Sequence, residues 1–581
     1  MALPSSKVFD MRMVRMGGIL FALLCAVQLD AQDLDSMVSV YASALPKEKI
    51  HVHFDRPQYN RGDTVWYKVY LLVEGLPSPL SKNLYVEWYD SAGTLLTQTV
   101  APLFQSTAHG AYPLPNNYTG SHVQFRAFTR WMLNDDTAFL YRRNLPLNNG
   151  VVSPPNAKPT ISKTSVALFP EGGSLVVGTK SRVAFKATAP SGLPVKIRGV
   201  VVNQKGEVMD SVKTIHDGMG SFFLWVQPGE DYRLDWVDNQ QQKGSTPLPT
   251  ALKDGVVLSV RATNEKAIVQ VERPQQSSED NKVLSLVVHQ EQHILFKAAI
   301  KLGERIQQRA DIPIDELPSG IVHFTLFDAQ QRPLAERIIL VNNHNHEFNA
   351  KLNPITVNLG KRGKNAVEIL VSDTAVSNLS IAVTDATVPN AWAHSIYSDF
   401  LLSNDIKGYV HQPAYYFTSD ADSITARLDL VLLTHGWRRF NWDKLKRGES
   451  PVVKYAPETA YMSLKGKVFG AKPTPGSPMQ LNFFLVNKDS SKQFFITPVD
   501  REGQFEEPGI FFYDTVKVYY GFNGNTKAAS GAQVKLDNGL LKKEPGFTLL
   551  PGALPPITGT MDSLARARLN YFLKEQDRLR K

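Results

Sequence analysis

Residues 51–71 read HVHFDRPQYNRGDTVWYKVYL, and this stretch decides the expected fold. In its second half Val65, Tyr67 and Val69 alternate with outward-facing positions, which predicts a β-strand with one buried face. Ahead of that strand, Gly62 permits a tight turn, and the Asp63 carboxylate can accept hydrogen bonds from turn amides. The stretch therefore predicts a strand, a turn and a second strand, which is a unit of an antiparallel sheet.

The first half of the stretch also permits a metal site. His51, His53 and Asp55 are spaced two apart, so on a strand they share one face, and imidazole and carboxylate groups are zinc ligands. The alternative is that both histidines are hydrogen-bonded strand residues and that Asp55 binds backbone amides of the turn. We favour this second interpretation because no other His or Glu cluster in the sequence is an obvious partner. We expect no metal and no cofactor.

The β pattern continues through most of the chain. Short runs rich in Val, Ile, Phe, Tyr and Thr alternate with polar residues and are separated by Gly, Pro, Asn and Asp turns. Linkers at 145–163, 238–250 and 341–349 divide the chain at intervals of about 100 residues, the size of an immunoglobulin-like domain. The predicted fold class is all-β, with tandem immunoglobulin-like β-sandwiches.

A helical pattern replaces the β pattern in a few places. One is a small helical insertion at 391–442, in which Asp422 or Ser423 can cap a helix that Gly436 ends. The predicted organisation is a signal peptide at 1–31, a helix at 32–45, β-sandwiches at 46–150, 160–240, 250–343 and 346–455, a further sandwich at 460–530, and a C-terminal helix at 560–581.

Residues 1–31 have the order of a secretory signal. Basic residues, Arg15 the last of them, precede the apolar run GGILFALLCAVQL, and Ala31 stands at the expected cleavage position. The run is too short to span a bilayer, so we expect an exported chain with no transmembrane segment after cleavage. Cys25 lies inside this leader and is the only cysteine. Its lipidation is an alternative, although Leu24 is larger than the residue that lipoprotein signals favour at that position.

Composition and motifs exclude several classes of function. The formal net charge of +9 over 581 residues forms no basic stripe with interleaved aromatic residues, so we expect no nucleic-acid partner. The sequence has no G-x-S-x-G, H-E-x-x-H or G-x-x-x-x-G-K-[ST] motif. We therefore predict no catalytic residues and no enzyme activity.

An unusual cluster lies in THGWRRFNW, residues 434–442. Trp and Arg are enriched in binding hot spots, so this segment can form an interaction patch. The alternative, which we favour, is that its aromatic rings anchor a connector between domains. The candidate residues are Trp437, Arg438, Arg439, Phe440 and Trp442.

The stretch FDRPQYNRGDTVWYKVYL resembles the strand–turn–strand signature that opens the second macroglobulin domain in the alpha-2-macroglobulin family. The resemblance implies that the sandwiches are macroglobulin-like. Macroglobulins that trap proteases covalently use a Cys-x-Glu-Gln thioester, and no cysteine follows residue 25, so we expect no such chemistry here. The matching positions are Asp55, Arg56, Pro57, Tyr59, Gly62, Asp63, Thr64 and Val65.

Other segments resemble a narrower group of envelope proteins from Gram-negative bacteria. They are residues 168–224, LPSGIVHFTLFDAQQRPLAERIILV at 317–341 and LDLVLLTHGWRRFNW at 428–442. The segment from LKGKVFG to DTVKVYYGF is similar to a carboxypeptidase-regulatory-like β-sandwich. Many members of this group carry a TonB-receptor plug domain after that point, and we expect none here.

These features together predict an exported, non-catalytic binding or scaffolding protein of the cell envelope, macroglobulin-like but without a thioester. Two alternatives stay open: a non-covalent endopeptidase inhibitor, and an accessory arm of a TonB-dependent outer-membrane uptake complex. The expected partner is an envelope protein, either an outer-membrane receptor or a protease. The expected location is the periplasm, the outer membrane or the cell surface of a Gram-negative bacterium.

Overall fold

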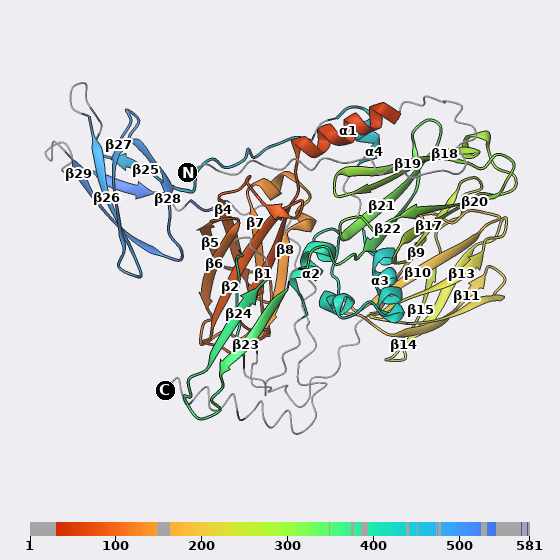
Figure 1. Ribbon diagram of the computed structural model, residues 1–581, viewed down its shortest axis with the longest axis horizontal. Helices are drawn as coiled ribbons and strands as arrows, with labels where there is room; N and C mark the ends of the chain where they lie inside the picture. Colours follow the sequence, from red (N-terminus) through yellow and green to blue (C-terminus); the bar gives the residue numbers. More distant parts are fainter. Residues whose placement is uncertain are drawn as a thin grey trace.

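The structure is a computed structural model that describes residues 31–147, 163–347, 349–372, 377–384, 393–436, 441–449, 451–471, 473, 478–523, 531–537, 539–541, 571 and 578. In this part of the chain, four β-sandwiches each consist of two antiparallel sheets around one apolar core. Figure 1 shows the second and third sandwiches together at one end, the first in the centre and the last at the opposite end. The predicted all-β class with tandem β-sandwiches is confirmed.

Sandwich 1 pairs two four-stranded sheets. One contains β1 (Glu48–Phe54), β2 (Thr64–Val73), β3 (Leu76–Pro77) and β6 (Thr107–Pro113), and the other contains β4 (Asn83–Tyr89), β5 (Leu95–Pro102), β7 (His122–Thr129) and β8 (Tyr141–Pro146). Two short 3-10 helices, η1 (Trp131–Asn134) and η2 (Thr137–Phe139), connect β7 to β8. In β2 the predicted alternation is present, because Val65, Tyr67 and Val69 are buried while Trp66 is exposed.

Sandwich 2 has one strand where the sequence predicted a linker. Its sheets are β9 (Ser165–Pro170), β10 (Lys180–Thr188) and β13 (Met219–Trp225), and β11 (Ile197–Asn203), β12 (Val208–Lys213), β14 (Tyr232–Asp238) and β15 (Lys243–Pro247). Strand β15 falls inside the predicted linker 238–250 and pairs with β14 from Lys243 to Pro247. Its sequence, KGSTP, has no apolar alternation because it is an edge strand held by backbone pairing, so periodicity could not reveal it.

Sandwich 3 carries the N-terminal helix on its surface. Its sheets are β16 (Val257–Ala262), β17 (Lys266–Glu272) and β20 (Gln307–Pro313), and β18 (Val283–Gln290), β19 (His293–Lys301), β21 (Gly320–Phe327) and β22 (Pro333–Val341), with η3 (Glu279–Asn281) ahead of β18. Helix α1 (Ala31–Ala44) lies along β19 and beside α4 (Trp442–Lys446), as Figure 1 shows.

The range 346–455 differs from the predicted fourth sandwich. Its described strands are only β23 (Ala350–Thr356) and β24 (Ala366–Val371), which form a two-stranded hairpin. The apolar alternation that predicted a sandwich is present in this hairpin, but no opposite sheet covers it among the described residues. All of β23 and half of β24 stay exposed.

This range also contains five described short helices, four of which lie between sandwiches. They are α2 (Ile396–Ser398), the π-helical turn η4 (Asp399–Ser403), η5 (Pro413–Phe417), α3 (Asp422–Thr434) and α4. We call α2, η4, η5 and α3 the helical layer. Leu402, Tyr416 and Val431 of this layer share an apolar core with Met219 of sandwich 2 and Ile338 of sandwich 3. Asp422 begins α3 rather than capping it, and Ala421 holds the cap position.

Sandwich 4 contains β25 (Met462–Phe469), β28 (Gln504–Ile510) and β30 (Gln533–Leu536) in one sheet, and β26 (Gln480–Asn487), β27 (Lys492–Pro498) and β29 (Val516–Asn523) in the other. It lies beside sandwich 1, where Glu458 accepts hydrogen bonds from the amides of Lys82 and Asn83 at 2.9 and 2.8 Å. The predicted signal peptide lies outside the described residues except at Ala31. So does the C-terminal helix, except at Tyr571 and Arg578, which are helical.

Candidate functional site

The turn at residues 55–63 forms through its own side chains. Asp55 Oδ1 accepts a hydrogen bond from the Trp66 amide at 2.9 Å and from the Tyr59 hydroxyl at 2.7 Å. Asp63 Oδ2 accepts the Asn60 amide at 2.7 Å, and Gly62 has a positive φ of 73°. Asp55 therefore binds a turn side chain and a backbone amide of β2, whereas our favoured interpretation assigned it backbone amides of the turn.

The two histidines of the same stretch point to separate partners. His51 Nδ1 lies 2.7 Å from Asp399 Oδ2 in the helical layer, whereas His53 Nδ1 lies 2.6 Å from the Ser380 hydroxyl. Burial lowers the pKa of His53. The predicted ladder of His51, His53 and Asp55 is thus divided among three environments. Within the described ranges, no three His, Cys, Asp or Glu side chains are gathered so that they could hold a metal ion.

Asp399 is the centre of a buried hydrogen-bonded group. Its second oxygen, Oδ1, lies 2.9 Å from His394 Nδ1, so the carboxylate accepts from two imidazole rings. Burial alone would raise the pKa of Asp399, but the hydrogen bonds and charge of His394 and His51 outweigh it and hold the pKa well below its ordinary value. Nearby, the Asn404 side-chain amide donates a hydrogen bond to the Ile50 carbonyl oxygen at 2.9 Å. The helical layer therefore covers the outer face of β1.

Lys49 joins three parts of the molecule at one ammonium group. Its Nζ donates to Asp405 Oδ2, in the turn that follows η4 of the helical layer, at 2.7 Å, and to Glu291, which lies between β18 and β19 of sandwich 3. Lys49 itself is a buried residue of β1. Because a buried charge is costly unless it is paired, this contact favours one relative placement of sandwich 1, sandwich 3 and the helical layer.

A second buried junction surrounds Arg337 of β22. Its guanidinium donates from Nε to Glu171 Oε1 at 2.9 Å and from Nη2 to Asp429 of α3. Arg182 of β10 approaches the other oxygen of Asp429 at 2.7 Å. Burial would raise the pKa of Asp429, but the two guanidinium groups lower it. These ion pairs join sandwich 2, sandwich 3 and α3.

Three described residues of the THGWRRFNW segment, Thr434, His435 and Trp442, are buried in the protein. Trp442 is 7% exposed and donates from Nε1 to Glu336 Oε1 at 2.8 Å. Buried Lys186 of β10 donates to His435 Nε2 at 2.7 Å, and burial lowers the pKa of His435 to about 4. A buried ring offers little surface to a partner. Trp442 therefore fits the alternative in which the aromatic rings anchor a connector between domains. Trp437, Arg438, Arg439 and Phe440 lie outside the described residues.

Trp442 also covers a pair of stacked histidines on sandwich 3. The rings of His289 and His323 are 4.5 Å apart with an interplanar angle of 9°, and the Trp442 ring meets His289 edge-on at 5.7 Å. Burial lowers the pKa of His289 to about 4. His289 therefore packs against α4 in its uncharged form.

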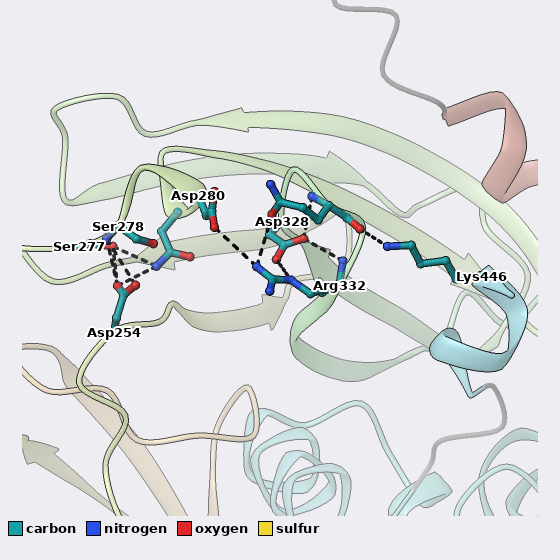
Figure 2. A network of polar contacts seen from close by, with 9 residues as sticks. Asp254, Ser277, Ser278, Asp280, Asp328, Arg332 and Lys446 are labelled. Atoms are coloured by element: carbon teal, nitrogen blue, oxygen red, sulfur yellow. Dashed lines mark hydrogen bonds and ion pairs between the residues drawn. The ribbon is translucent and has the colours of Figure 1, made fainter.

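Figure 2 shows the polar network at the end of sandwich 3. Asp254 accepts hydrogen bonds from the Ser277 hydroxyl at 2.9 Å and the Asn281 side chain at 2.8 Å. On the neighbouring turn, Arg332 Nε donates to Asp328 Oδ2 at 2.6 Å, and Lys446 of α4 donates to the carbonyl oxygen of Gln330. These bonds stay within the chain, so we interpret the network as structural.

A cavity of about 890 Å³ opens on the sheet of β25, β28 and β30 in sandwich 4. Lys465 and Glu506 in its lining form an ion pair at 2.8 Å, and the lysine lowers the pKa of Glu506. Catalytic acids and bases have pKa values moved toward neutrality, and this carboxyl group is moved away from it. The pKa of Glu506 is therefore not shifted in the direction expected of a general acid or base.

The hairpin of β23 and β24 is largely exposed, and in β23 every residue is exposed. Leu352 pairs with Ile369 and Pro354 with Val367, so one face of the hairpin is apolar. Leu352 is 67% exposed and Val367 is 58% exposed. Each strand pairs only with the other among the described residues, which leaves one backbone edge of each strand open. Sequence patterning had placed this apolar face inside a sandwich.

The tip of the hairpin is basic and apolar. Leu359 is 95% exposed, and Lys361, Arg362 and Lys364 follow it in an exposed turn. The later residues 377–384 lie against sandwich 1, where the Tyr70 hydroxyl donates to the Ser380 hydroxyl at 2.8 Å. This contact holds the chain on the C-terminal side of the hairpin against a folded domain.

Sequence reasoning missed the junction residues Asp399, Asp405 and Arg337. A signal for Arg337 was available, because LAERIILV places adjacent charges inside a strand that is otherwise apolar on both faces. Charges at such positions indicate burial against another charged element. Among the described helices, none combines the length and the apolar composition needed to cross a bilayer.

No protein-family model and no curated protein matches the chain. Among solved structures, it is similar to native alpha-2-macroglobulin of Escherichia coli, with 9% identity over 84% of this chain and 38% of that chain and a TM-score of 0.16. Salmonella alpha-2-macroglobulin reacted with methylamine is 10% identical over 85% of this chain and 38% of that chain, with a TM-score of 0.16. A tetra-tandem repeat from the extending region of a large adhesion protein is 10% identical to this chain. The match covers 82% of this chain and 99% of that chain, with a TM-score of 0.14.

The chain spans less than half the length of the macroglobulins that it matches. At these TM-scores the matches do not establish a shared arrangement of domains. The fold therefore rests on the sheets of this chain and their registers.

Proposed function

We propose that the protein is an exported, non-catalytic binding protein of the cell envelope, macroglobulin-like without a thioester, and that it docks a partner protein on the hairpin of β23 and β24. The observation that carries this proposal is the exposed apolar face of that hairpin together with its two backbone edges, which no other described strand pairs with. A partner strand that pairs with either edge gains main-chain hydrogen bonds, and its side chains can cover the apolar face.

The physical need for a partner follows from the size of the hairpin. A two-stranded hairpin alone is marginally stable in water, and independent stability requires a third strand or a covering layer. Open edges with apolar side chains are also the sites at which chains pair with other chains. The basic turn at Lys361, Arg362 and Lys364 favours a partner with acidic residues beside its binding strand.

The rest of the molecule supports this role as a rigid frame. The junctions at Lys49 and Arg337 hold sandwiches 1, 2 and 3 and the helical layer in one arrangement, and a docking element on a fixed frame loses less entropy on binding. The leader-like residues 1–31 support export. The proposed partner is an envelope protein, either an outer-membrane receptor or a protease.

A pull-down from envelope extracts tests the proposal. The full chain is compared with a Leu352→Lys/Val367→Lys variant, which charges the apolar face, and with a Val208→Lys/Ile215→Lys control, which charges exposed apolar residues of sandwich 2. We expect a partner that the full chain and the control retain and the hairpin variant loses. Equal recovery by all three proteins, or no recovered protein, contradicts the proposal.

A further inference from the structure

The outer face of one sheet of sandwich 4 carries a row of exposed rings. In β26, the side chains of Leu481, Phe483 and Leu485 point inward and are fully buried, so Phe484 points outward. Its cross-strand neighbours are Phe494 on β27 and Tyr519 on β29. The three rings therefore form one row across three adjacent strands, which lie at the left-hand end of the molecule in Figure 1.

These rings are available to a ligand. Phe484 is 47% exposed and Tyr519 is 57% exposed, and the Phe484 and Phe494 rings support each other at 4.6 Å. The sandwich core does not need them, because it is completed by the inward-facing side chains. We call Phe484, Phe494, Tyr519 and the adjoining exposed Ile496 the aromatic face.

Polar groups of two kinds border the aromatic face. On one side, Lys492 and Lys517 occupy the next row on the two outer strands, about 7 Å along the strands. Both are exposed, and neither forms an ion pair with another described residue. On the other side, Asn482 lies in the row of Ile496, and Gln480 and Asn523 form an amide row beyond it, in which Asn523 Nδ2 donates to Gln480 Oε1 at 3.2 Å. The face thus combines rings, cations and amide groups in successive rows.

We propose that the aromatic face binds an acidic polysaccharide. The C–H faces of sugar rings stack on aromatic side chains, carboxylates of the sugars pair with Lys492 and Lys517, and hydroxyl groups hydrogen-bond to the amide row. A peptide strand gains little here, because β26 is the central strand and its backbone groups are already paired with β27 and β29. This site is separate from the hairpin and does not depend on the role proposed for it.

Single-stranded nucleic acid is the competing class, since it also uses stacking rings and cations. Single-stranded nucleic acid needs a line of basic residues that contacts many phosphates in succession. This face offers only the pair of Lys492 and Lys517, and its other border is formed by amide side chains. Amide side chains suit the many hydroxyl groups of a polysaccharide. The arrangement therefore favours the acidic sugar polymer.

Affinity electrophoresis of the full chain tests the site with three probes: polygalacturonate, the same polymer with its carboxylates methyl-esterified, and an oligothymidylate. The variants are Phe484→Ser/Tyr519→Ser and Lys492→Gln/Lys517→Gln. The controls are Phe469→Ser, which removes a ring of equal 47% exposure from the other sheet, and Tyr519→Phe, which keeps the ring. Circular dichroism establishes that each variant is folded.

We expect the full chain to bind polygalacturonate more tightly than the esterified polymer. Removing two rings weakens binding to polygalacturonate by about tenfold or more, and removing the two lysines abolishes the preference for the free acid. Both controls bind as the unchanged protein does. The proposal is overturned if polygalacturonate is not bound, if the Phe484→Ser/Tyr519→Ser variant binds normally, or if the oligothymidylate binds more tightly.

Discussion

His51 on β1 and Asp399 in the helical layer lie 2.7 Å apart, between Nδ1 and Oδ2, although 348 positions separate them in the sequence. The contact helps to bury the outer face of β1, which would be exposed to water in an isolated sandwich. It also fixes where the helical layer begins relative to sandwich 1. The frame that carries the hairpin therefore depends on a few buried polar contacts between distant segments.

Replacing Asp399 with alanine should loosen this junction. The change leaves the His51 and His394 rings buried without their acceptor, so we expect a loss of about 3 kcal/mol in the free energy of opening. Hydrogen exchange of the amides in β1 and η4 measures that free energy. Asp420→Ala, at a carboxylate that is 63% exposed, is the control and should change it by less than about 0.5 kcal/mol. Unchanged exchange in Asp399→Ala would show that the contact does not hold the layer.

Acid should destabilise the packing of α4 through His289. Burial lowers its pKa to about 4, so between that value and the ordinary value of about 6.5 the unfolded chain binds a proton that the folded chain does not. Stability is therefore complete above about pH 6.5 and falls by up to about 3 kcal/mol as the pH drops to about 4. Thermal unfolding across this range measures the loss.

The variant His289→Gln cannot take up the proton and should lose less stability over the same range. His344→Gln is the control, because neighbouring Glu347 and Asp420 raise the pKa of that exposed histidine and its contribution has the opposite sign. If His289→Gln and the unchanged protein lose the same stability in acid, the pH dependence comes from groups other than His289.

Arg337→Met should separate sandwich 2 from sandwich 3. The variant leaves Glu171 without its buried cation and leaves Asp429 paired with Arg182 alone, and breaking a buried pair costs about 3–5 kcal/mol. Limited proteolysis and hydrogen exchange of α3 report the opening. Adding Glu171→Gln removes the unpaired buried carboxylate and should restore much of the protection. Arg309→Met, at a surface ion pair, should have no comparable effect.

Short-range features were predicted well from the sequence. The turn formed by Asp55, Tyr59, Gly62 and Asp63 depends on bonds within a dozen residues, so its geometry follows from local composition. The four sandwiches follow from period-2 alternation for the same reason. Strand β15 was missed because an edge strand without apolar residues leaves no periodic signal.

Long-range features could not be predicted in this way. The partners of His51 and Lys49 come from segments more than 200 positions away, and no spacing rule connects them. The hairpin was placed in a sandwich because alternation reports an apolar face and not what covers it. The row of Phe494, Phe484 and Tyr519 became visible only when the strand registers were known.

Site-specific photo-cross-linking from the hairpin tests the central claim most directly. A benzophenone amino acid replaces Leu359, which is 95% exposed at the hairpin tip, and in a control it replaces Val208 on β12, which is 61% exposed. On irradiation in cells that produce the full chain, we predict one defined adduct with an envelope protein from position 359 and none from position 208. Absence of an adduct at 359, or equal adducts at both positions, would contradict a docking role for the hairpin.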